Sequence, residues 1–256
     1  MINNELLSSI DNLKNIYNTS TPFPFVIMEN FLSPHLANLI LQECKRFKDY
    51  DYEGKYMPDQ TWGQSNKEFM PSAIDTHNDQ SRAEMARHLP LTWHTINYLN
   101  SNKVLDFIGK ITGINNLEGD PTFMGGGVHK ISAGGHLDVH TDYTINWFIK
   151  RRRRLNLLVY LNNDWQDYYN GNLELWDSNL TNCVVQIRPI FNRAILFQTT
   201  GPAFHGHPIP LNTPEGISRY SLALYYYTDD VKGHVEQTVD FQRPPNAREV
   251  KEAPII

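Results

Sequence analysis

Cysteine is scarce in this chain of 256 residues, in which Cys44 and Cys183 are the two examples. Two cysteines cannot build the disulfide framework of a small secreted scaffold. Long hydrophobic runs are missing as well, since no apolar stretch approaches the ~18 residues that a membrane-spanning helix needs. The first residues also lack a basic segment followed by an apolar run. We therefore expect no secretory signal, and a cytoplasmic protein.

An excess of positive charge is also lacking, because 23 Lys and Arg face 28 Asp and Glu for a net charge of −5. This balance gives no electrostatic reason to expect nucleic acid or a membrane surface as a partner. The basic run at 151–154 is expected to be a solvated loop at the start of a strand rather than a phosphate-binding patch. What is present is ordinary for a globular protein with a buried core, with 40% hydrophobic and 20% charged residues.

The N-terminal half shows helical patterns after one early strand. Residues 22–32 predict a strand, and Ser33-Pro34 predicts a helix start for an amphipathic helix over 34–48. Residues 1–20 have a weak helical pattern, residues 50–80 read as a long loop, and residues 81–110 are helical with an interruption at Pro90. We expect these helices to brace one face of a sheet.

Short β-rich runs separated by turn residues follow from residue 121 onward. They lie at 154–162, 172–177, 183–187, 193–198 and 219–228. Their spacing predicts antiparallel strands in a sandwich or jelly roll. A single domain of 1–256 is expected, with N-terminal strand and bracing helices at 1–120, a β core at 121–230 and an extended tail at 231–256.

The stretch GGHLDVHTDY, residues 134–143, carries four metal-capable side chains: His136, Asp138, His140 and Asp142. On a regular strand all four would point to one face, so alternation alone does not show which His-x-Asp pair binds a metal. A second group follows much later, where His205 and His207 both qualify in AFHGHPIP. Two histidines and one carboxylate form the facial triad that holds iron(II) and leaves positions open.

Arg219 begins the strand-like segment RYS, with Ser221 two positions on and therefore on the same face. An inward-facing arginine on an apolar strand is costly unless an anionic group pairs with it. A guanidinium binds a carboxylate with two hydrogen bonds, and a hydroxyl adds another donor. This pair predicts an acidic cosubstrate.

Taken together, these segments resemble the prolyl 4-hydroxylase-like branch of the 2-oxoglutarate- and iron(II)-dependent oxygenases. The resemblance covers residues 104–228 and rests on LDFIGKITGI, DPTFMGGGVHKISAGGHLDVHTDY, RRLNLLVYLNNDW, GNLELWD, PIFNRAILFQTTGPAFHGHPIPL and RYSLALYYYT. The opening PFPFVIMENFLSP is similar to the strand and helix that begin such proteins. The resemblance implies a mainly β fold with N-terminal helices, in which helices brace a double-stranded β-helix, or jelly-roll, core.

The resemblance also implies the site. The metal ligands would be His140, Asp142 and His205, while Arg219, Ser221 and Tyr160 would hold the distal carboxylate of 2-oxoglutarate. Iron(II), 2-oxoglutarate and O2 would then hydroxylate an unactivated C–H of a prolyl residue, an amino acid or another small molecule, with succinate and CO2 as coproducts. Related halogenases lack the carboxylate ligand, so Asp142 favours hydroxylation or desaturation.

The sequence departs from this family at one position, because related prolyl hydroxylases place a tyrosine where this chain has His129-Lys130. His129 is therefore expected to be a polar wall residue of the site or a structural hydrogen-bonding residue. His207 is expected beside the ligands, His136 and Asp138 at the pocket rim, and Trp176 in the core rather than against substrate.

Substrate specificity is expected in the loop at 50–80 and the turn at 163–171, where Trp62 and Tyr168 would line an entrance.

Two other classes of protein would use some of these residues. A redox-inert zinc or manganese enzyme on a cupin-like barrel would need the histidines but has no use for Arg219 and Ser221. A non-catalytic binding module could retain the fold, although degenerate copies usually lose a ligand, and here all three ligands and the arginine are present.

Overall fold

The computed structural model describes residues 1–47, 51–52, 64–70 and 79–242. Its helices are α1 (Asn4–Ser8), α2 (Ile10–Thr19), α3 (Pro34–Arg46), α4 (Asp79–His88), α5 (Pro90–Leu99), α6 (Asn102–Thr112) and the 3₁₀ turn η2 (Asp167–Tyr169). Its strands are β1 (Phe25–Met28), β2 (Asp51–Tyr52), β3 (Gln64–Met70), β4 (Glu118–Gly119), β5 (Gly127–Thr141), β6 (Ile145–Asn146), β7 (Arg151–Tyr160), β8 (Leu173–Trp176), β9 (Cys183–Ile187), β10 (Ala194–Gln198), β11 (His205–His207), β12 (Arg219–Thr228) and β13 (Asp240–Gln242).

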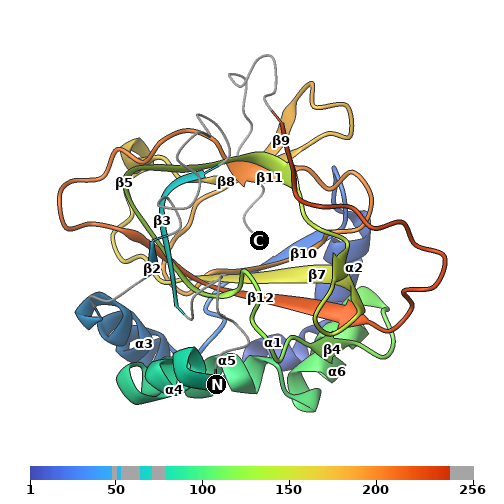
Figure 1. The fold of residues 1–256 in the computed structure, drawn as a ribbon, viewed down its shortest axis with the longest axis horizontal. Coiled ribbons are helices and arrows are strands. Elements are labelled where there is room, and N and C mark those ends of the chain that lie inside the picture. The colour runs from blue at the N-terminus through green and yellow to red at the C-terminus, as the bar shows by residue number, and fades with distance from the viewer. Residues whose placement is uncertain (48–50, 53–63, 71–78, 243–256) are drawn as a thin grey trace.

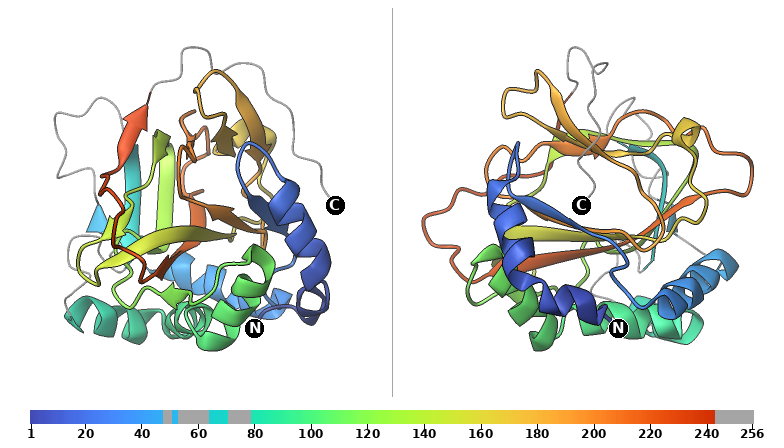
Figure 2. Two further views of the ribbon diagram at one scale, coloured as in Figure 1. Left: turned by 90° about the vertical axis from the view of Figure 1, so that its right-hand side faces the viewer. Right: turned by 180° about the vertical axis from the view of Figure 1, so that it is seen from behind.

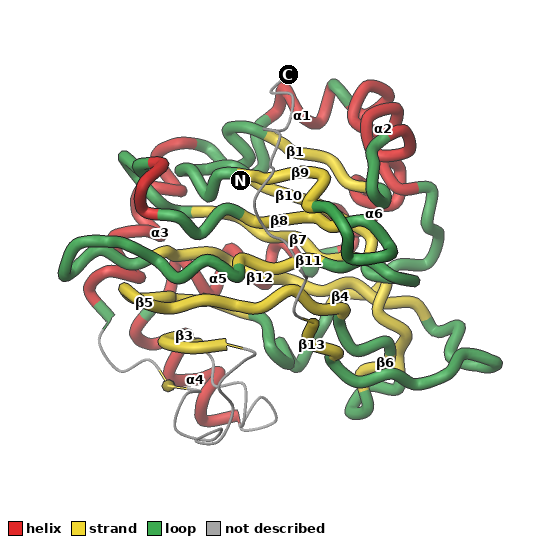
Figure 3. Tube along the Cα trace, turned by 90° about the horizontal axis from the view of Figure 1, so that it is seen from above, coloured by secondary structure: helices red, strands yellow, loops and turns green. Residues whose placement is uncertain are grey.

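The strands form a curled antiparallel sheet whose path runs β1-β10-β7-β12-β5-β11-β8-β9. The long strand β5 belongs to both halves of the roll, since its first residues pair with β12 and its last residues pair with β11. Figure 1 shows the two halves facing each other, with β5, β8 and β11 above β7, β10 and β12, and Figure 3 shows the strands from above. The interior between the two inner faces is called the lumen below.

The N-terminal helices gather on the outer face of the β7–β12 half of the roll (Figures 1 and 2). Their apolar side chains form one buried cluster with the outward residues of these strands, including Leu157, Leu222 and Leu224. The local signals in the sequence explain the helix ends. Pro34 occupies the first turn of α3, and Gly113 ends α6 in the left-handed conformation at φ 72°.

Both faces of β12 are buried. One face packs against the helices, and the other lines the lumen. Leu222 and Leu224 pack under the helices. Arg219, Ser221 and Tyr225 alternate with them and line a cavity in the lumen. The period of two in a strand therefore separates residues of the scaffold from residues of the site.

The expected fold class, a helix-braced jelly roll with mainly β structure, is confirmed. The expected helix over 34–48 and the break at Pro90 correspond to α3 and to the α4–α5 junction. The expectation of a loop throughout 50–80 is wrong for residues 64–70, because β3 there pairs with β5. In the tail, residues 240–242 form β13, which pairs with β5 beside His140.

The arginine run also differs from its expected structure. Residues 151–154 lie within β7 rather than in a solvated loop, and Arg153 is 3% exposed. One step along β12, from Tyr226 to Tyr227, corresponds to two steps along β7, from Leu155 to Arg153. This bulge places an extra residue in β7 and turns Arg153 toward the lumen.

None of the helices in the described ranges is long and apolar enough to cross a membrane.

A second bulge lies where β11 meets β5. His205 pairs with His140 and His207 pairs with Leu137, so two steps on β11 correspond to three steps on β5. The extra residue reverses the alternation, and both Leu137 and His140 therefore face the lumen. The backbones approach closely here, because a Cβ on Gly206 would lie 2.7 Å from the carbonyl oxygen of Asp138.

We predict that Gly206→Ala destabilises the protein by about 1–3 kcal/mol, the usual cost of inserting a methyl group into a closely packed site. Chemical denaturation of the apo-protein would measure it. Gly201→Ala is the control for backbone strain without a contact, because its Cβ would meet nothing within 4 Å while its φ of 76° costs an alanine roughly 1 kcal/mol. A loss for Gly206→Ala that does not exceed that of Gly201→Ala would contradict the close approach of the strands.

Candidate active site

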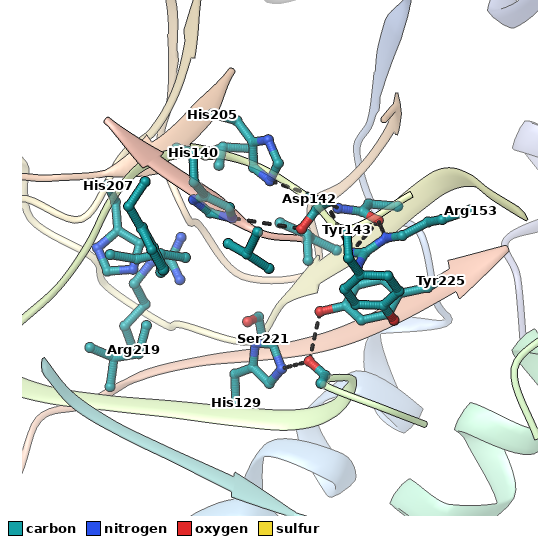
Figure 4. A pocket seen from close by; sticks show the side chains of 18 residues that line it. His129, His140, Asp142, Tyr143, Arg153, His205, His207, Arg219, Ser221 and Tyr225 are labelled. Carbon is teal, nitrogen blue, oxygen red and sulfur yellow. Dashed lines mark hydrogen bonds and ion pairs between the residues drawn. The ribbon is translucent and has the colours of Figure 1, made fainter. Parts of the chain in front are cut away.

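Three metal-capable side chains meet at the bulge between β5 and β11. His140, Asp142 and His205 each offer one ligand atom, and these atoms all lie within 4.8 Å of one another. Asp142 Oδ1 is 3.7 Å from His140 Nε2, and Asp142 Oδ2 is 3.5 Å from His205 Nε2. All three side chains are buried. Figure 4 shows them pointing toward one another. His140 and His205 lie on the adjacent strands β5 and β11, and Asp142 directly follows the end of β5.

Each histidine is held in the orientation that a metal ligand needs. His140 Nδ1 donates to the carbonyl oxygen of Asp138 over 2.8 Å, and His205 Nδ1 donates to that of Ala203 over 2.9 Å. A carbonyl oxygen only accepts, so the proton must lie on Nδ1 in both rings. The Nε2 lone pairs are then directed at the shared centre. Burial lowers the pKa of His205 to about 4, so its ring is neutral at physiological pH.

The carboxylate of Asp142 is ionised although it is buried. Burial by itself would raise its pKa, but the positive charge of Arg153 lowers it below its usual value. Arg153 Nη2 lies 3.1 Å from Asp142 Oδ2. Asn156 Nδ2 donates to the same oxygen over 2.8 Å. The site therefore presents a charged oxygen donor, which suits a divalent cation.

A cavity of about 250 Å³ joins the three ligands to Arg219 and Ser221. Arg219 is 4% exposed, and burial lowers its pKa from the usual value. Its Nε donates to the Gly171 carbonyl over 2.9 Å, and its Nη2 donates to the Tyr160 hydroxyl over 3.1 Å. Among the residues that the structure describes, no carboxylate pairs with Arg219. A buried cation whose described partners are neutral favours the binding of an anion.

Gly171 allows this arginine to lie where it does. A Cβ at Gly171 would lie 3.2 Å from Arg219 Cδ and 2.5 Å from Leu211 Cδ2, and the residue has a φ of 78°. Both facts require glycine. The turn that carries Gly171 thereby fixes the end of the cavity opposite the metal ligands.

The remaining candidate residues fall into two groups. His129 and His207 line the cavity, and His129 Nε2 donates to the Gly125 carbonyl over 2.8 Å. The lining does not include His136 and Asp138, because the bulge turns them away from His140. The expectation that alternation points all four residues of this stretch to one face is therefore wrong.

Trp176 is fully buried against Val139 and Cys183. Tyr168 is 63% exposed on η2 and is not part of the cavity wall. Trp62 lies outside the described residues.

Four residues of the site were not assigned to it by the sequence patterns: Arg153, Asn156, Tyr143 and Tyr225. Arg153 belongs to a basic run that was expected to be a solvated loop. The bulge in β7 turns its side chain toward the lumen, which Asn156 also faces. Tyr225 shares the inner face of β12 with Arg219 and Ser221, so alternation from Arg219 could have found it.

Comparisons with known proteins agree with this geometry. Residues 126–227 match the sequence profile of the 2OG-Fe(II) oxygenase superfamily. No curated protein matched the sequence. Among solved structures, the chain is similar to a prolyl hydroxylase from Trichoplax adhaerens in complex with a hypoxia inducible factor oxygen degradation domain peptide fragment. The sequences are 21% identical, the TM-score is 0.59, and the match covers 90% of this chain and 96% of that chain.

Two further structures share the fold. A prolyl 4-hydroxylase from Phytophthora capsici is 15% identical with a TM-score of 0.54, covering 90% of this chain and 67% of that chain. HygX from Streptomyces hygroscopicus, with nickel and 2-oxoglutarate bound, is 11% identical with a TM-score of 0.51, covering 94% of this chain and 98% of that chain.

A jelly roll with an intact His-Asp-His triad defines the class of this protein as a metal-dependent dioxygenase. Residues 126–227 belong to the 2OG-Fe(II) oxygenase superfamily, as the sequence resemblance implied. The protein is a 2-oxoglutarate-dependent dioxygenase, and iron(II) and 2-oxoglutarate are the cofactor and cosubstrate that its family and triad imply. Two imidazole nitrogens and an ionised carboxylate fit this metal.

We predict that His205→Ala weakens metal binding by more than ~100-fold, since even the loss of an outer partner of a ligand typically costs 10–100-fold. Titration of the apo-protein with Mn²⁺, followed by electron paramagnetic resonance, would measure it. The matched control is His207→Ala, two residues along the same strand and also in the cavity wall. It should still bind one ion per chain. Equal losses in both variants would argue against this choice of ligand.

Proposed function

We propose that the cavity holds 2-oxoglutarate between the triad and Arg219, and that the enzyme hydroxylates a prolyl residue of a peptide. The observation that carries the first part is the buried guanidinium of Arg219, which shares one cavity with the triad and has no carboxylate partner among the described residues. Ser221 lies two residues along the same face of β12 and adds a hydroxyl donor. Tyr160 supports the arginine through its hydroxyl.

The chemistry divides between the bound groups and the protein. When bound, iron(II) and 2-oxoglutarate supply the oxidation of a C–H bond by O2, with succinate, CO2 and a hydroxylated product. The side chains of this chain hold the metal, orient the cosubstrate carboxylate and exclude water from a buried site. Arg219 suits its part because a guanidinium stays charged even when burial lowers its pKa.

Aromatic side chains support a prolyl substrate. In Figure 4, Arg219 and His207 lie to one side of the triad, while Tyr143 and Tyr225 lie to the other. On that side the guanidinium of Arg153 pairs with the Asp142 carboxylate, and the rings of Tyr143 and Tyr225 lie against it. An uncharged saturated ring such as that of proline would pack against tyrosine faces. The structural likeness to prolyl hydroxylases agrees with this choice.

We predict that Arg219→Met weakens 2-oxoglutarate binding by roughly 2–5 kcal/mol, the usual range for truncating one partner of a buried, hydrogen-bonded charge pair. The charge-transfer absorption of the anaerobic iron(II) complex would measure the affinity. The control ligand is 2-oxopentanoate, which has the same chain length but no distal carboxylate. Its affinity should be the same for wild type and variant. An equal loss for both acids would show that Arg219 does not act on that carboxylate.

We also predict that a proline-containing peptide raises the rate of succinate formation and gains one oxygen atom, whereas free proline does neither. Mass spectrometry of the peptide and an assay for succinate would measure this. The same peptide with alanine in place of proline is the matched control. Hydroxylation of free proline without any peptide activity would contradict the proposed substrate, while the cosubstrate site would stand.

A further inference from the structure

Two side chains of β7 enclose one oxygen of the metal-binding carboxylate. Asp142 Oδ2 is 3.1 Å from Arg153 Nη2 and accepts from Asn156 Nδ2 over 2.8 Å. Asn156 Oδ1 in turn accepts from Nε and Nη2 of Arg153 at 3.0 and 2.8 Å. The three side chains therefore form a closed, buried hydrogen-bonded triangle, drawn in Figure 4 around Asp142 and Arg153.

This network fixes the direction of the Asn156 amide. The guanidinium of Arg153 has only donors, so the amide oxygen must face it. The NH2 group must then face Asp142, whose ionised carboxylate has only acceptors. The donor and the acceptor of every hydrogen bond in the triangle are therefore fixed. None of the three side chains can rotate without breaking a hydrogen bond to the other two.

Arg153 is itself held from both sides by aromatic rings. Its Cζ lies 3.5 Å from the centre of the Tyr225 ring and 4.6 Å from that of Tyr143. The Tyr225 hydroxyl donates to the Gly125 carbonyl over 2.6 Å, and the Tyr143 hydroxyl is 2.8 Å from that of Tyr227. The rings are therefore anchored to the turn before β5 and to β12, and the guanidinium is not free to follow a rotating carboxylate.

We propose that Arg153 and Asn156 are positioning residues that keep Asp142 Oδ2 bonded to the protein, so that Oδ1 alone binds the metal. Three protein ligands would leave room at the metal for a chelating 2-oxo acid and for O2. A second bond from Asp142 would take up the room that O2 needs. The triangle would prevent this by holding Oδ2 away.

Nitric oxide tests this proposal directly, because it occupies the open position of an iron(II) complex and gives a distinct electron paramagnetic resonance signal. The full chain would be loaded with iron(II) and 2-oxoglutarate without oxygen and then titrated with nitric oxide. We expect Arg153→Met and Asn156→Leu to need about tenfold or more nitric oxide for the same signal, in line with the usual effect of losing an outer partner of a ligand. Arg153→Lys, which retains the charge and a donor, should recover part of the loss.

The matched control is Arg154→Met, which removes the neighbouring guanidinium. Arg154 Nη1 donates to the Thr228 hydroxyl over 3.2 Å and lies 3.6 Å from Asp230 Oδ2, away from the metal ligands. It should bind nitric oxide like wild type. Wild-type titrations for Arg153→Met and Asn156→Leu would overturn the proposal, and so would an equal loss in Arg154→Met.

Removing Arg153 leaves a buried carboxylate with fewer partners, so circular dichroism of each apo-protein would accompany the titrations. If Arg153→Met does not fold, Asn156→Leu and Arg153→Lys decide the question, and wild-type titrations in both would overturn the proposal. The measurement needs no substrate and no turnover. A failure of the proposed prolyl substrate would therefore leave it unaffected.

Discussion

The buried negative charge of Asp142 is the constraint on which the architecture of the active site depends. A carboxylate this far from water is stable only where opposite charge and hydrogen-bond donors surround it. Here the guanidinium of Arg153 and the amide of Asn156 supply them, both from the inner face of β7. The strands must therefore hold their register closely, because a slip of one residue would turn these groups outward.

The two buried arginines of the cavity illustrate opposite uses of the same side chain. Arg153 is compensated within the protein, by Asp142 and by the faces of two tyrosines. Arg219 meets only the Gly171 carbonyl and the Tyr160 side chain within the described structure. One charge therefore organises the metal ligands, while the other is left for an anionic ligand. Under the proposed function, the cosubstrate and the substrate would therefore lie on different sides of the triad.

The helices contribute to the site without touching it. They cover the outer face of the β7–β12 half of the roll, where their side chains form one core with the outward residues of these strands. Burial of apolar side chains on the outer face stabilises the strands, and this offsets the cost of burying polar groups on the inner face. On β12, Leu222 and Leu224 supply the apolar burial, and Arg219 and Ser221 are the buried polar groups.

The sequence by itself determined the class of fold and, through its resemblance to a family, the residues of the triad. The evidence was a set of sequence patterns: short β runs, a helix that begins at a proline, and His-x-Asp followed by a distant histidine. Such patterns can be recognised without knowing how the strands pair. The sequence also indicated Arg219, because a lone arginine on an apolar strand needs an anion. The tertiary structure decided which neighbours face the metal. One extra residue in β5 turns His140 inward and His136 away, and another in β7 turns Arg153 toward Asp142. A bulge forms only when two strands pair, so strict alternation along a single strand could not reveal either change.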